Sequence, residues 1–527
     1  MSTVTTRRCH DIRRALLAQE ELALIDVREE DPFAQGHPLF AANIPLSKLE
    51  LEIFARVPRR DTALTVYDDG EGLAAVAAQR LLALGYINVA VLDGGLAGWR
   101  AAGGELFRDV NVPSKAFGEL VESVRHTPSL AAEQVKALLD GQANVVVLDA
   151  RRFDEYQTMS IPGGISVPGA ELVLRVAELA PDPATQVIVN CAGRTRSIIG
   201  TQSLINAGIP NPVAALRNGT IGWTLAGQQL AHGQDRRFAE VGAGTRANAA
   251  GQARAVADRA GVLRLDRAGL GQWQADTQRT LYLFDVRTTE EYSAGHLPGS
   301  RSVPGGQLVQ ETDHVASVRG ARIALVDDDG VRANMSASWL AQMGWQVAVV
   351  DGLTAADFSD RGEWQPPLPE LPDASEITVE QLASWLQEDG TVVLDFTASA
   401  NYVKRHIPGA YWAIRAQLAD ALERPPEARR YVLTCGSSLL ARFAARDLQS
   451  LTRTPVYVLA GGTARWIAAG LPLEGGEARL AVPRSDRYRR PYEGTDNPHE
   501  AMQGYLDWEF GLIAQLERDG THGFRVL

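Results

Sequence analysis

The stretch VVVLDARRFDEY, residues 145–156, decides the fold because the chain repeats it three more times. Each copy is a short, largely β-branched apolar run that ends at an aspartate, which predicts a buried strand. The copies begin about one domain length apart, so the repeat indicates tandem domains and not a solenoid. The other copies are LALIDVREEDPF (22–33), LYLFDVRTTEEY (281–292) and VVLDFTASANY (392–402).

The sequence downstream of each copy repeats as well. A second apolar run is followed by a stretch with helical character, and a third run ends in a glycine turn. Short apolar strands that alternate with helices predict an α/β fold, with a mainly parallel sheet flanked by helices in each of four domains. The second runs are ALTVYD (63–68), QVIVNC (186–191), RIALVD (322–327) and YVLTC (431–435).

Changes in composition predict the domain boundaries. An Ala/Gly/Arg-rich stretch (242–261) separates the second repeat from the third, and a proline-rich stretch (366–373) separates the third from the fourth as a stiff spacer. Helical periodicity in GYLDWEFGLIAQLE (504–517) indicates a capping helix packed on a domain, with a partner-docking helix as the alternative. We expect domains at 1–108, 125–234, 258–365 and 374–475, followed by a C-terminal extension at 476–527.

Composition limits the classes of protein and of partner. Of the 527 residues, 45% are hydrophobic and 22% are charged, which is typical of soluble globular proteins. The formal net charge of −12 disfavours nucleic-acid and anionic-membrane partners. No apolar run approaches the roughly 20 residues that span a bilayer. The first residues lack the apolar segment of a secretory signal, so we expect a cytoplasmic protein.

The three cysteines, Cys9, Cys191 and Cys435, lie far apart in the sequence. Their odd number and isolation disfavour a disulfide framework and a zinc site. Cys191 and Cys435 each end the second apolar run of a repeat and begin a short loop before a helix. Reactive groups gather at such strand ends in parallel sheets. Repeats one and three carry Asp68 and Asp327 there, which predicts that these two domains are catalytically silent.

The two cysteine loops are the predicted active sites, with Cys191 as the principal nucleophile and Cys435 as a second candidate. A helix N-terminus and loop amides would stabilise each thiolate, and two arginines would add positive charge in the first loop. Cys9, beside His10, is expected to be structural. The residues predicted to bind substrate are Ala192, Gly193, Arg194, Thr195 and Arg196 in the first loop, and Gly436, Ser437 and Ser438 in the second.

With these residues in view, the chain resembles the rhodanese superfamily. The resemblance implies four tandem rhodanese-like domains, in which one and two, and three and four, form pairs of one silent and one active domain. It also implies that the D-x-R segments belong to the family pattern, and we expect them to hold the fold through ion pairs. The matching features are D-x-R at residues 26–28, 149–151 and 285–287, the turns HLPG (296–299) and HIPG (406–409), the cysteine loops, and GGLAGW (94–99) and GGTARW (461–466).

The resemblance further implies an enzyme of the thiosulfate sulfurtransferase type. A small donor such as thiosulfate would pass its outer sulfur to the cysteine, and a thiol or cyanide would remove it from the persulfide. The persulfide itself would carry the sulfur, so no metal or organic cofactor is expected. One alternative from a different class remains open: a persulfide carrier or redox sensor that delivers sulfur to a protein acceptor.

Loop length distinguishes the chain from phosphatases that share the rhodanese fold, which need C-x₅-R. Arg196 comes one residue too early for that pattern, and Arg442 one residue too late. The arginines of the first loop would bind a dianionic donor, or else would only pair with a surface carboxylate. The second loop, CGSSLLA (435–441), resembles the CGSGVTA loop of mercaptopyruvate sulfurtransferases, so that activity at Cys435 is a further alternative.

Overall fold

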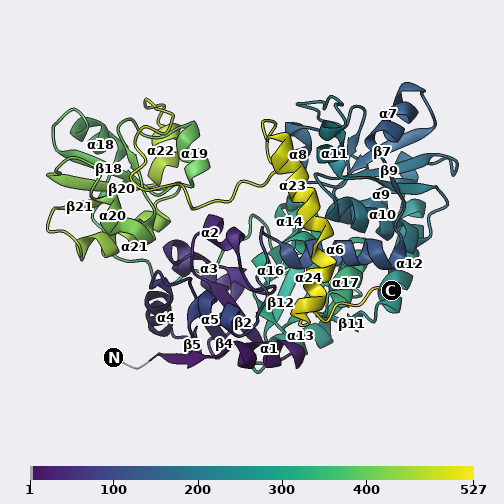
Figure 1. Ribbon diagram of the computed structural model, residues 1–527, viewed down its shortest axis with the longest axis horizontal. Helices are drawn as coiled ribbons and strands as arrows, with labels where there is room; N and C mark the ends of the chain where they lie inside the picture. The colour runs from purple at the N-terminus through teal and green to yellow at the C-terminus, as the bar shows by residue number, and fades with distance from the viewer. Residues whose placement is uncertain (1–3) are drawn as a thin grey trace.

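The computed structural model describes residues 4–527 and contains four α/β domains, each with a largely parallel sheet between helices (Figure 1). This arrangement confirms the fold class predicted from the repeat. In the part of the chain that the structure describes, no helix is long and apolar enough to cross a membrane.

Domain 1 shows the plan that the other domains repeat. Its elements are β1 (Thr5–Arg7), α1 (Cys9–Leu17), β2 (Leu22–Asp26), α2 (Glu30–Gln35), β3 (Ala42–Asn43), the 3₁₀ helix η1 (Leu46–Lys48), α3 (Leu49–Arg56), β4 (Ala63–Tyr67), α4 (Leu73–Ala83), β5 (Val89–Leu92) and α5 (Gly95–Ala101). Its own strands are parallel and lie in the order β1-β5-β4-β2, with β3 beside β2. Every residue of β2 is buried, because helices cover both faces of the sheet.

Domain 2 follows a connecting helix, α6 (Val112–Arg125). Its elements are β6 (Ser129–Leu130), α7 (Ala132–Asp140), β7 (Val145–Asp149), α8 (Phe153–Thr158), β8 (Ile165–Ser166), the 3₁₀ helix η2 (Gly169–Glu171), α9 (Leu172–Leu179), β9 (Gln186–Asn190), α10 (Thr195–Ala207), β10 (Val213–Leu216) and α11 (Gly219–Leu225). The strands are parallel, in the order β6-β10-β9-β7-β8.

Domain 3 follows α12 (Ala243–Arg259), which forms within the Ala/Gly/Arg-rich stretch. Its elements are β11 (Leu263–Leu265), α13 (Arg267–Ala275), β12 (Leu281–Asp285), α14 (Thr289–Ala294), β13 (Arg301–Ser302), α15 (Gly305–Gln310), α16 (Thr312–Val315), β14 (Val318–Arg319), β15 (Arg322–Val326), α17 (Arg332–Gln342), β16 (Gln346–Val350) and the 3₁₀ helix η3 (Ala355–Asp357). Its sheet is parallel, in the order β11-β16-β15-β12-β13.

Domain 4 lies beyond the proline-rich stretch. Its elements are β17 (Glu376–Ile377), α18 (Val379–Trp385), β18 (Thr391–Asp395), α19 (Ser399–Lys404), β19 (Tyr411–Trp412), the 3₁₀ helix η4 (Arg415–Gln417), α20 (Leu418–Ala421), β20 (Arg430–Thr434), α21 (Leu439–Gln449), β21 (Val456–Leu459) and α22 (Gly462–Ala468). The sheet is parallel, in the order β17-β21-β20-β18-β19.

Domains 1 and 3 share one hydrophobic core. Strand β14 leaves the sheet of domain 3 and pairs antiparallel with β2 of domain 1, with Val318 opposite Ala23. The Tyr282 hydroxyl of domain 3 donates a hydrogen bond of 2.6 Å to the carbonyl oxygen of Arg56 in domain 1. Apolar side chains of both domains form a single buried cluster. Domains 1 and 3, which carry an aspartate at the cysteine position, therefore form one structural unit.

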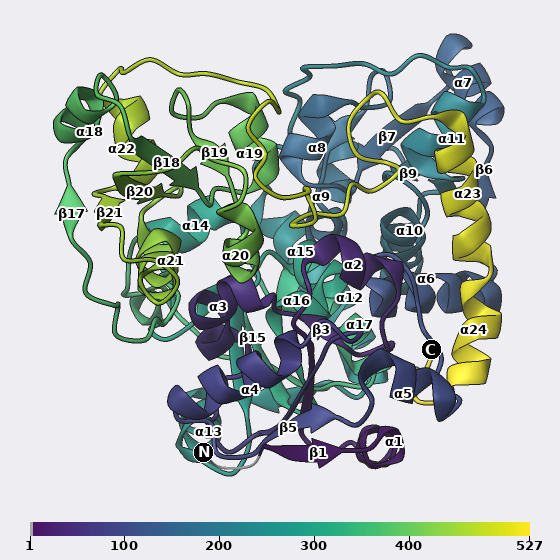
Figure 2. The ribbon, with the colours of Figure 1, turned by 60° about the vertical axis from the view of Figure 1, so that its left-hand side comes forward.

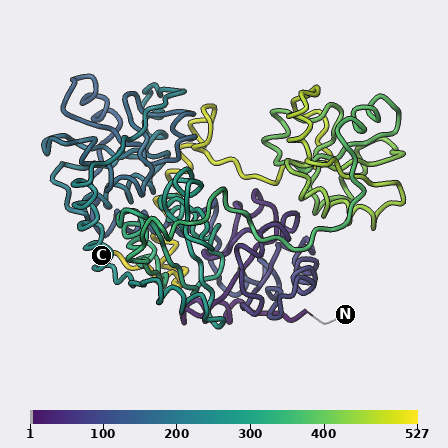
Figure 3. Tube along the Cα trace, turned by 180° about the vertical axis from the view of Figure 1, so that it is seen from behind, coloured from purple at the N-terminus to yellow at the C-terminus, as the bar shows by residue number. Residues whose placement is uncertain are grey.

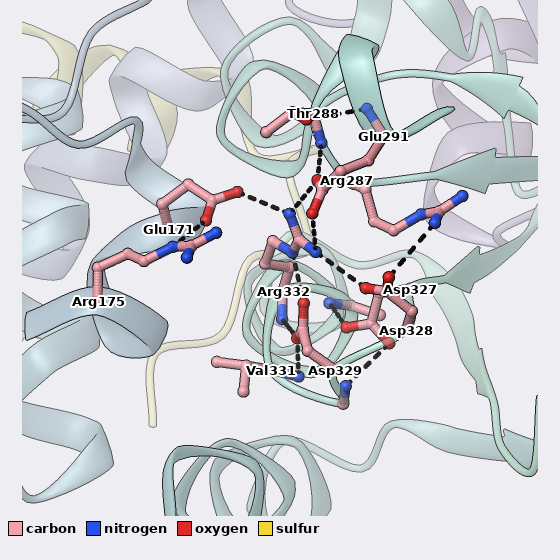
Figure 4. A network of polar contacts seen from close by, with 12 residues as sticks. Glu171, Arg175, Arg287, Thr288, Glu291, Asp327, Asp328, Asp329, Val331 and Arg332 are labelled. Carbon is pink, nitrogen blue, oxygen red and sulfur yellow. Dashed lines mark hydrogen bonds and ion pairs between the residues drawn. The ribbon is translucent and has the colours of Figure 1, made fainter. Parts of the chain in front are cut away.

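Each cysteine-bearing domain docks onto this unit through buried ion pairs. Arg415 of domain 4 donates to both carboxylate oxygens of Glu50 in domain 1, over 2.6 and 2.9 Å. Arg332 of domain 3 donates to Glu171 of domain 2 over 2.9 Å (Figure 4). At each junction, equivalent segments after the edge strand contact each other: η1 with η4, and α15 with η2.

This docking differs from the pairs that the family resemblance implied. In space, domain 2 pairs with domain 3, and domain 4 pairs with domain 1 (Figure 2). Each pair still joins one domain with an aspartate at the strand end to one that carries a cysteine there. The difference arises because complementary surfaces on the segments after the edge strands determine which domains dock. Proximity in the sequence does not determine it.

The C-terminal segment crosses between the cysteine-bearing domains. It leaves domain 4, runs as an extended strap to domain 2, and ends in helices α23 (His499–Phe510) and α24 (Leu512–Asp519) (Figures 1 and 3). α23 contacts α11 of domain 2, and α24 contacts α6. The segment expected as one helix thus forms two helices that meet at Gly511, and the first of them packs on domain 2.

Arg332 should be a main determinant of the junction between domains 2 and 3. Its side chain is 2% exposed and also pairs with Asp329 and Glu291, so Arg332→Met removes the cation that these carboxylates share, although Glu171 keeps its pair with Arg175. We expect a loss of about 3–5 kcal/mol of unfolding free energy, measured by urea denaturation.

Arg237→Ala is the matched control. Arg237 pairs with Glu290 across the same junction, but both side chains are at least half exposed. That variant should lose less than about 1 kcal/mol. Equal losses for the two variants would contradict a role for the buried network.

Candidate functional site

The two cysteines occupy one structural position in their domains. Cys191 directly follows β9 and Cys435 directly follows β20. Asp68 and Asp327 follow the equivalent strands β4 and β15, as the sequence predicts. All four side chains therefore lie at the carboxyl end of a central parallel strand, where ligands bind in α/β sheets.

A glycine turn after the third strand holds each cysteine loop in place. Gly219 and Gly462 have φ angles of +55° and +63°, and a Cβ at either would collide with the carbonyl oxygen of the loop cysteine. The next amide, of Thr220 or of Thr463, donates to that same oxygen over 2.9 or 2.8 Å. Glycine is needed here both for the backbone conformation and for the close approach.

Backbone amides at the start of the following helix face the side chain after the strand. In domains 1 and 3, Asp68 accepts a hydrogen bond of 2.9 Å from the amide of Ala74, and Asp327 accepts one of 2.8 Å from the amide of Ala333. The equivalent amide in domain 2 is that of Ser197, which hydrogen-bonds to the Cys191 sulfur. The four domains thus share an anion-binding loop, and a fixed carboxylate fills it in two of them.

The Cys435 loop is an amide cradle with an open mouth. Four backbone amides, those of Ser437, Ser438, Leu440 and Ala441, lie near the sulfur and favour its ionised form. Burial raises the pKa of the Cys435 thiol, and these four amides oppose that rise. Gly436 and Ser437 are exposed, although Cys435 itself is only 4% exposed. Ser438 adopts a left-handed φ of +76°, which lets the loop turn back toward the sulfur.

The Cys191 loop is closed. Cys191 is 2% exposed, and Ala192, Gly193, Arg194 and Thr195 are buried as well. The thiol donates to Ser197 Oγ over 3.4 Å. Burial raises the pKa of the Cys191 thiol, while the positive charge of Arg196 and the contacts with Ser197 oppose the rise.

Both arginines of the first loop are paired with carboxylates. Arg194 donates to Glu119 over 2.7 and 2.9 Å and also pairs with Glu122. Arg196 donates to Glu155 over 2.7 and 2.8 Å. Burial opposes ionisation of Glu155, but Arg196 still lowers its pKa to about 2. The alternative in which an arginine serves an ion pair therefore has structural support, and binding of a donor by either arginine stays a prediction.

The D-x-R segments form buried ion pairs, in agreement with their expected structural role. The Arg–Asp distances are 2.6 Å for Arg28–Asp26, 2.8 Å for Arg151–Asp149 and 2.6 Å for Arg287–Asp285. In domain 4, where Thr397 replaces the arginine, the Thr397 amide donates to Asp395 over 2.8 Å.

Sequence reasoning missed the groups that surround the first loop. Glu155 and Glu291 recur in the E-Y of repeats two and three, each with an arginine, Arg196 or Arg332, at the start of the later helix. The recurrence of this glutamate together with this arginine could have predicted the ion pairs from the sequence. Glu509, which comes from the C-terminal segment, had no such signal.

A polar cavity of about 280 Å³ lies beside Arg196. Domains 2 and 3 and the C-terminal segment line it, with Arg151, Gln310, Arg490 and Tyr492 among the lining residues. Because this cavity is polar and adjoins a loop arginine, it could hold a small charged molecule near domain 2.

Comparisons with known proteins agree with the four-domain organisation. A model of the rhodanese-like domain family matches residues 11–102, 131–226, 268–353 and 378–469. The crystal structure of a thiosulfate sulfurtransferase from Pseudomonas aeruginosa is 77% identical, with a TM-score of 0.99 over 99% of this chain and all of that one.

Two curated relatives match smaller parts of the chain. A thiosulfate sulfurtransferase of Azotobacter vinelandii is 28% identical over 207 residues, which are 35% of this chain and 74% of the relative. A putative thiosulfate sulfurtransferase, SseB, of Mycobacterium tuberculosis is 32% identical over 127 residues, 22% of this chain and 43% of the relative.

Gly462 should be essential for the shape of the Cys435 loop. Gly462→Ala adds a Cβ that collides with the Cys435 carbonyl, so we expect a loss of about 2–4 kcal/mol in urea unfolding. Gly470→Ala is the control, because Gly470 has a similar φ of +68° with no atom within 4 Å of its Cβ position. It should lose only about 1 kcal/mol from backbone strain. A loss as large for Gly470→Ala would mean that strain alone matters.

Proposed function

The chain belongs to the rhodanese-like family, and we propose that it transfers sulfane sulfur from thiosulfate to a thiol or to cyanide through a cysteine persulfide. The enzyme class predicted from the sequence, a rhodanese-type sulfurtransferase, is confirmed by the 77% identical structure. The donor, the persulfide and the acceptors are the part proposed here. The names of the relatives supply the support for thiosulfate.

The amide cradle at Cys435 is the observation that carries the proposal, and it favours Cys435 as the first sulfur carrier. The sequence ranked Cys191 first because of its two arginines. In the structure those arginines are paired and the Cys191 loop is covered, whereas the Cys435 loop is open at Gly436 and Ser437. A donor in solution therefore has a shorter route to Cys435.

The proposed reaction has two displacement steps at sulfur. The Cys435 thiolate attacks the outer sulfur of thiosulfate, a new S–S bond forms, and the old S–S bond breaks as sulfite leaves with the electron pair. A thiolate or cyanide then attacks the outer sulfur of the persulfide and releases the Cys435 thiolate. The amides of the cradle stabilise negative charge on sulfur in both steps without moving, which is the kind of fixed dipole that lowers such barriers.

The loops also favour sulfur transfer over phosphate release. Neither loop places an arginine at the position that a phosphatase of this fold uses, and the groups that face the Cys435 sulfur are amides. A cradle filled by one sulfur atom leaves less room for a tetrahedral phosphate. Release of phosphate from an aryl phosphate in a Cys435-dependent reaction would contradict this assignment.

Cysteine variants test which loop carries sulfur. Cys435→Ser should lower thiosulfate:cyanide turnover by about a hundredfold or more, because serine is a far weaker nucleophile. Cys191→Ser should keep most of the activity. Intact mass after incubation with thiosulfate should show one added sulfur atom in Cys191→Ser and none in Cys435→Ser.

The reverse pattern would move the carrier to domain 2. Full activity in both variants would reject a persulfide on either cysteine. Sulfur gained without turnover to cyanide or a small thiol would favour the alternative of a carrier for a protein acceptor. Replacing thiosulfate by mercaptopyruvate in the same assay compares the two donors at Cys435.

A further inference from the structure

We propose that Tyr505 and Glu509, carried by α23 of the C-terminal segment, close the Cys191 loop and so determine which of the two cysteines accepts sulfur. The proposal rests on the proposed function for the sulfur chemistry. The closure itself concerns access to a thiol and can be measured separately.

The backbone of the Cys191 loop abuts α23. A Cβ built on Gly193 would lie 3.0 Å from Cε1 of Tyr505 and 3.3 Å from Oε2 of Glu509. In the second loop, a Cβ on Gly436 would meet no atom within 4 Å. The face through which the Cys435 loop opens to solvent is thus occupied by a helix at Cys191.

A small apolar cluster and an arginine stacked on an aromatic ring hold α23 on domain 2. Ile221 of α11 packs with Met502, Tyr505 and Leu506 in a small buried cluster. The guanidinium of Arg194 lies 4.2 Å from the ring centroid of Phe510, at the C-terminal end of the same helix. Arg194 therefore links the cysteine loop to the helix that covers it.

A buried lysine adds a second attachment. Lys115 of α6 forms an ion pair of 2.6 Å with Asp109 and is 1% exposed. Its ammonium lies 5.3 Å from the ring of Tyr492, 5.1 Å from that of Tyr505 and 5.6 Å from that of Trp508. Three aromatic rings of the C-terminal segment thus surround one fixed cation from the connecting helix.

Glu509 is a buried carboxyl group aimed at the loop. It has no exposed surface, and its Oε1 accepts a hydrogen bond of 2.8 Å from the Tyr505 hydroxyl. Its Oε2, the atom nearest Gly193, has no hydrogen-bond partner among residues 4–527. A buried carboxyl group with an unpartnered oxygen is stable there only in its neutral form, so ionisation should weaken the closure.

Space on either side of the strap lets the segment move. Tyr492 and Gly494 line both the cavity of about 280 Å³ beside Arg196 and a second cavity of about 160 Å³ beside α11. The chain that leads into α23 therefore crosses between two hollows and is not packed tightly on both sides. The first cavity reaches Arg196 at the end of the Cys191 loop, and the second reaches Thr220 and Ile221 of α11.

The pH dependence follows from the charge on Glu509. Burial raises the pKa of Glu509 to about 8, and Glu119 adds to the rise, while Lys115, Tyr505 and Arg194 oppose it. Cys191 also interacts with Glu509. When α23 lifts, the pKa of Glu509 returns to an ordinary value near ~4.3.

The two pKa values of Glu509, in the closed and the lifted state, determine how the stability of the closure changes with pH. The closed form binds the proton more tightly, so closure is most stable at low pH. Its stability falls as the pH rises from about 4.3 to about 8, and changes no further above that. Cys191 should therefore become more accessible across that interval.

Alkylation of the native full-length chain with iodoacetamide, followed by peptide mass spectrometry, tests the closure. Cys435 and Cys9 serve as references inside the same molecule. In the unmodified protein at neutral pH, Cys191 should react about tenfold more slowly than Cys435 or slower still. Tyr505→Ala should raise the Cys191 rate by about tenfold or more and leave the Cys435 and Cys9 rates unchanged.

Glu509→Gln keeps the shape of the side chain but removes its ionisation. The Cys191 rate of the unmodified protein, divided by that of Glu509→Gln, should rise between pH 5 and 8 and then level off. Asp507→Asn is the matched control, because Asp507 is an exposed carboxylate on the same helix. It should follow the unmodified protein at every pH.

Three results would each overturn the closure. The first is a Cys191 rate equal to that of Cys435 in the unmodified protein. The second is an unchanged Cys191 rate in a folded Tyr505→Ala variant. The third, decisive if Tyr505→Ala does not fold, is a Glu509→Gln pH profile that matches the unmodified protein. None of these rates requires sulfur transfer, so a failure of the proposed function in the turnover assay would leave them unaffected.

Discussion

Backbone amides at the start of one helix decide what each domain can do. In all four domains, an amide of that helix points at the side chain that follows the central strand. Where that side chain is an aspartate, its carboxylate already satisfies the amides. Where it is a cysteine, the same amides can stabilise charge on sulfur. One fold therefore yields domains with a carboxylate or a thiol at the same position through a single side chain, and the two domains with the carboxylate form the unit onto which the others dock.

Local patterns in the sequence were enough for the fold and for the position of both cysteines. The apolar runs before Asp26, Asp149, Asp285 and Asp395 predicted strands that the structure contains, and the family and enzyme class are confirmed. The strands could be predicted from these runs because a buried parallel strand has to be apolar along its whole length. The ion pairs within D-x-R were predictable for a similar reason, since both partners lie within one turn of chain.

The environment of each cysteine depended on contacts between distant segments, which no local pattern encodes. Two arginines near Cys191 suggested a cationic loop, but Glu119 and Glu155 neutralise them. The cover over that loop comes from Tyr505 and Glu509, hundreds of residues further along the chain. The pairing of domains differed for the same reason, since Glu50 and Arg415 meet only after both domains have folded.

The helix that covers the Cys191 loop is synthesised after domain 2, because it lies near the C-terminus of the chain. Domains fold largely as they emerge from the ribosome, so the sheet of domain 2 forms while α23 is still unmade. At ordinary elongation rates the Cys191 loop lacks this helix for roughly 15–60 s. During that interval the nascent chain lacks the helix that abuts Gly193 in the finished protein. Oxidative damage to Cys191 should therefore depend more on the speed of translation than on the age of the protein.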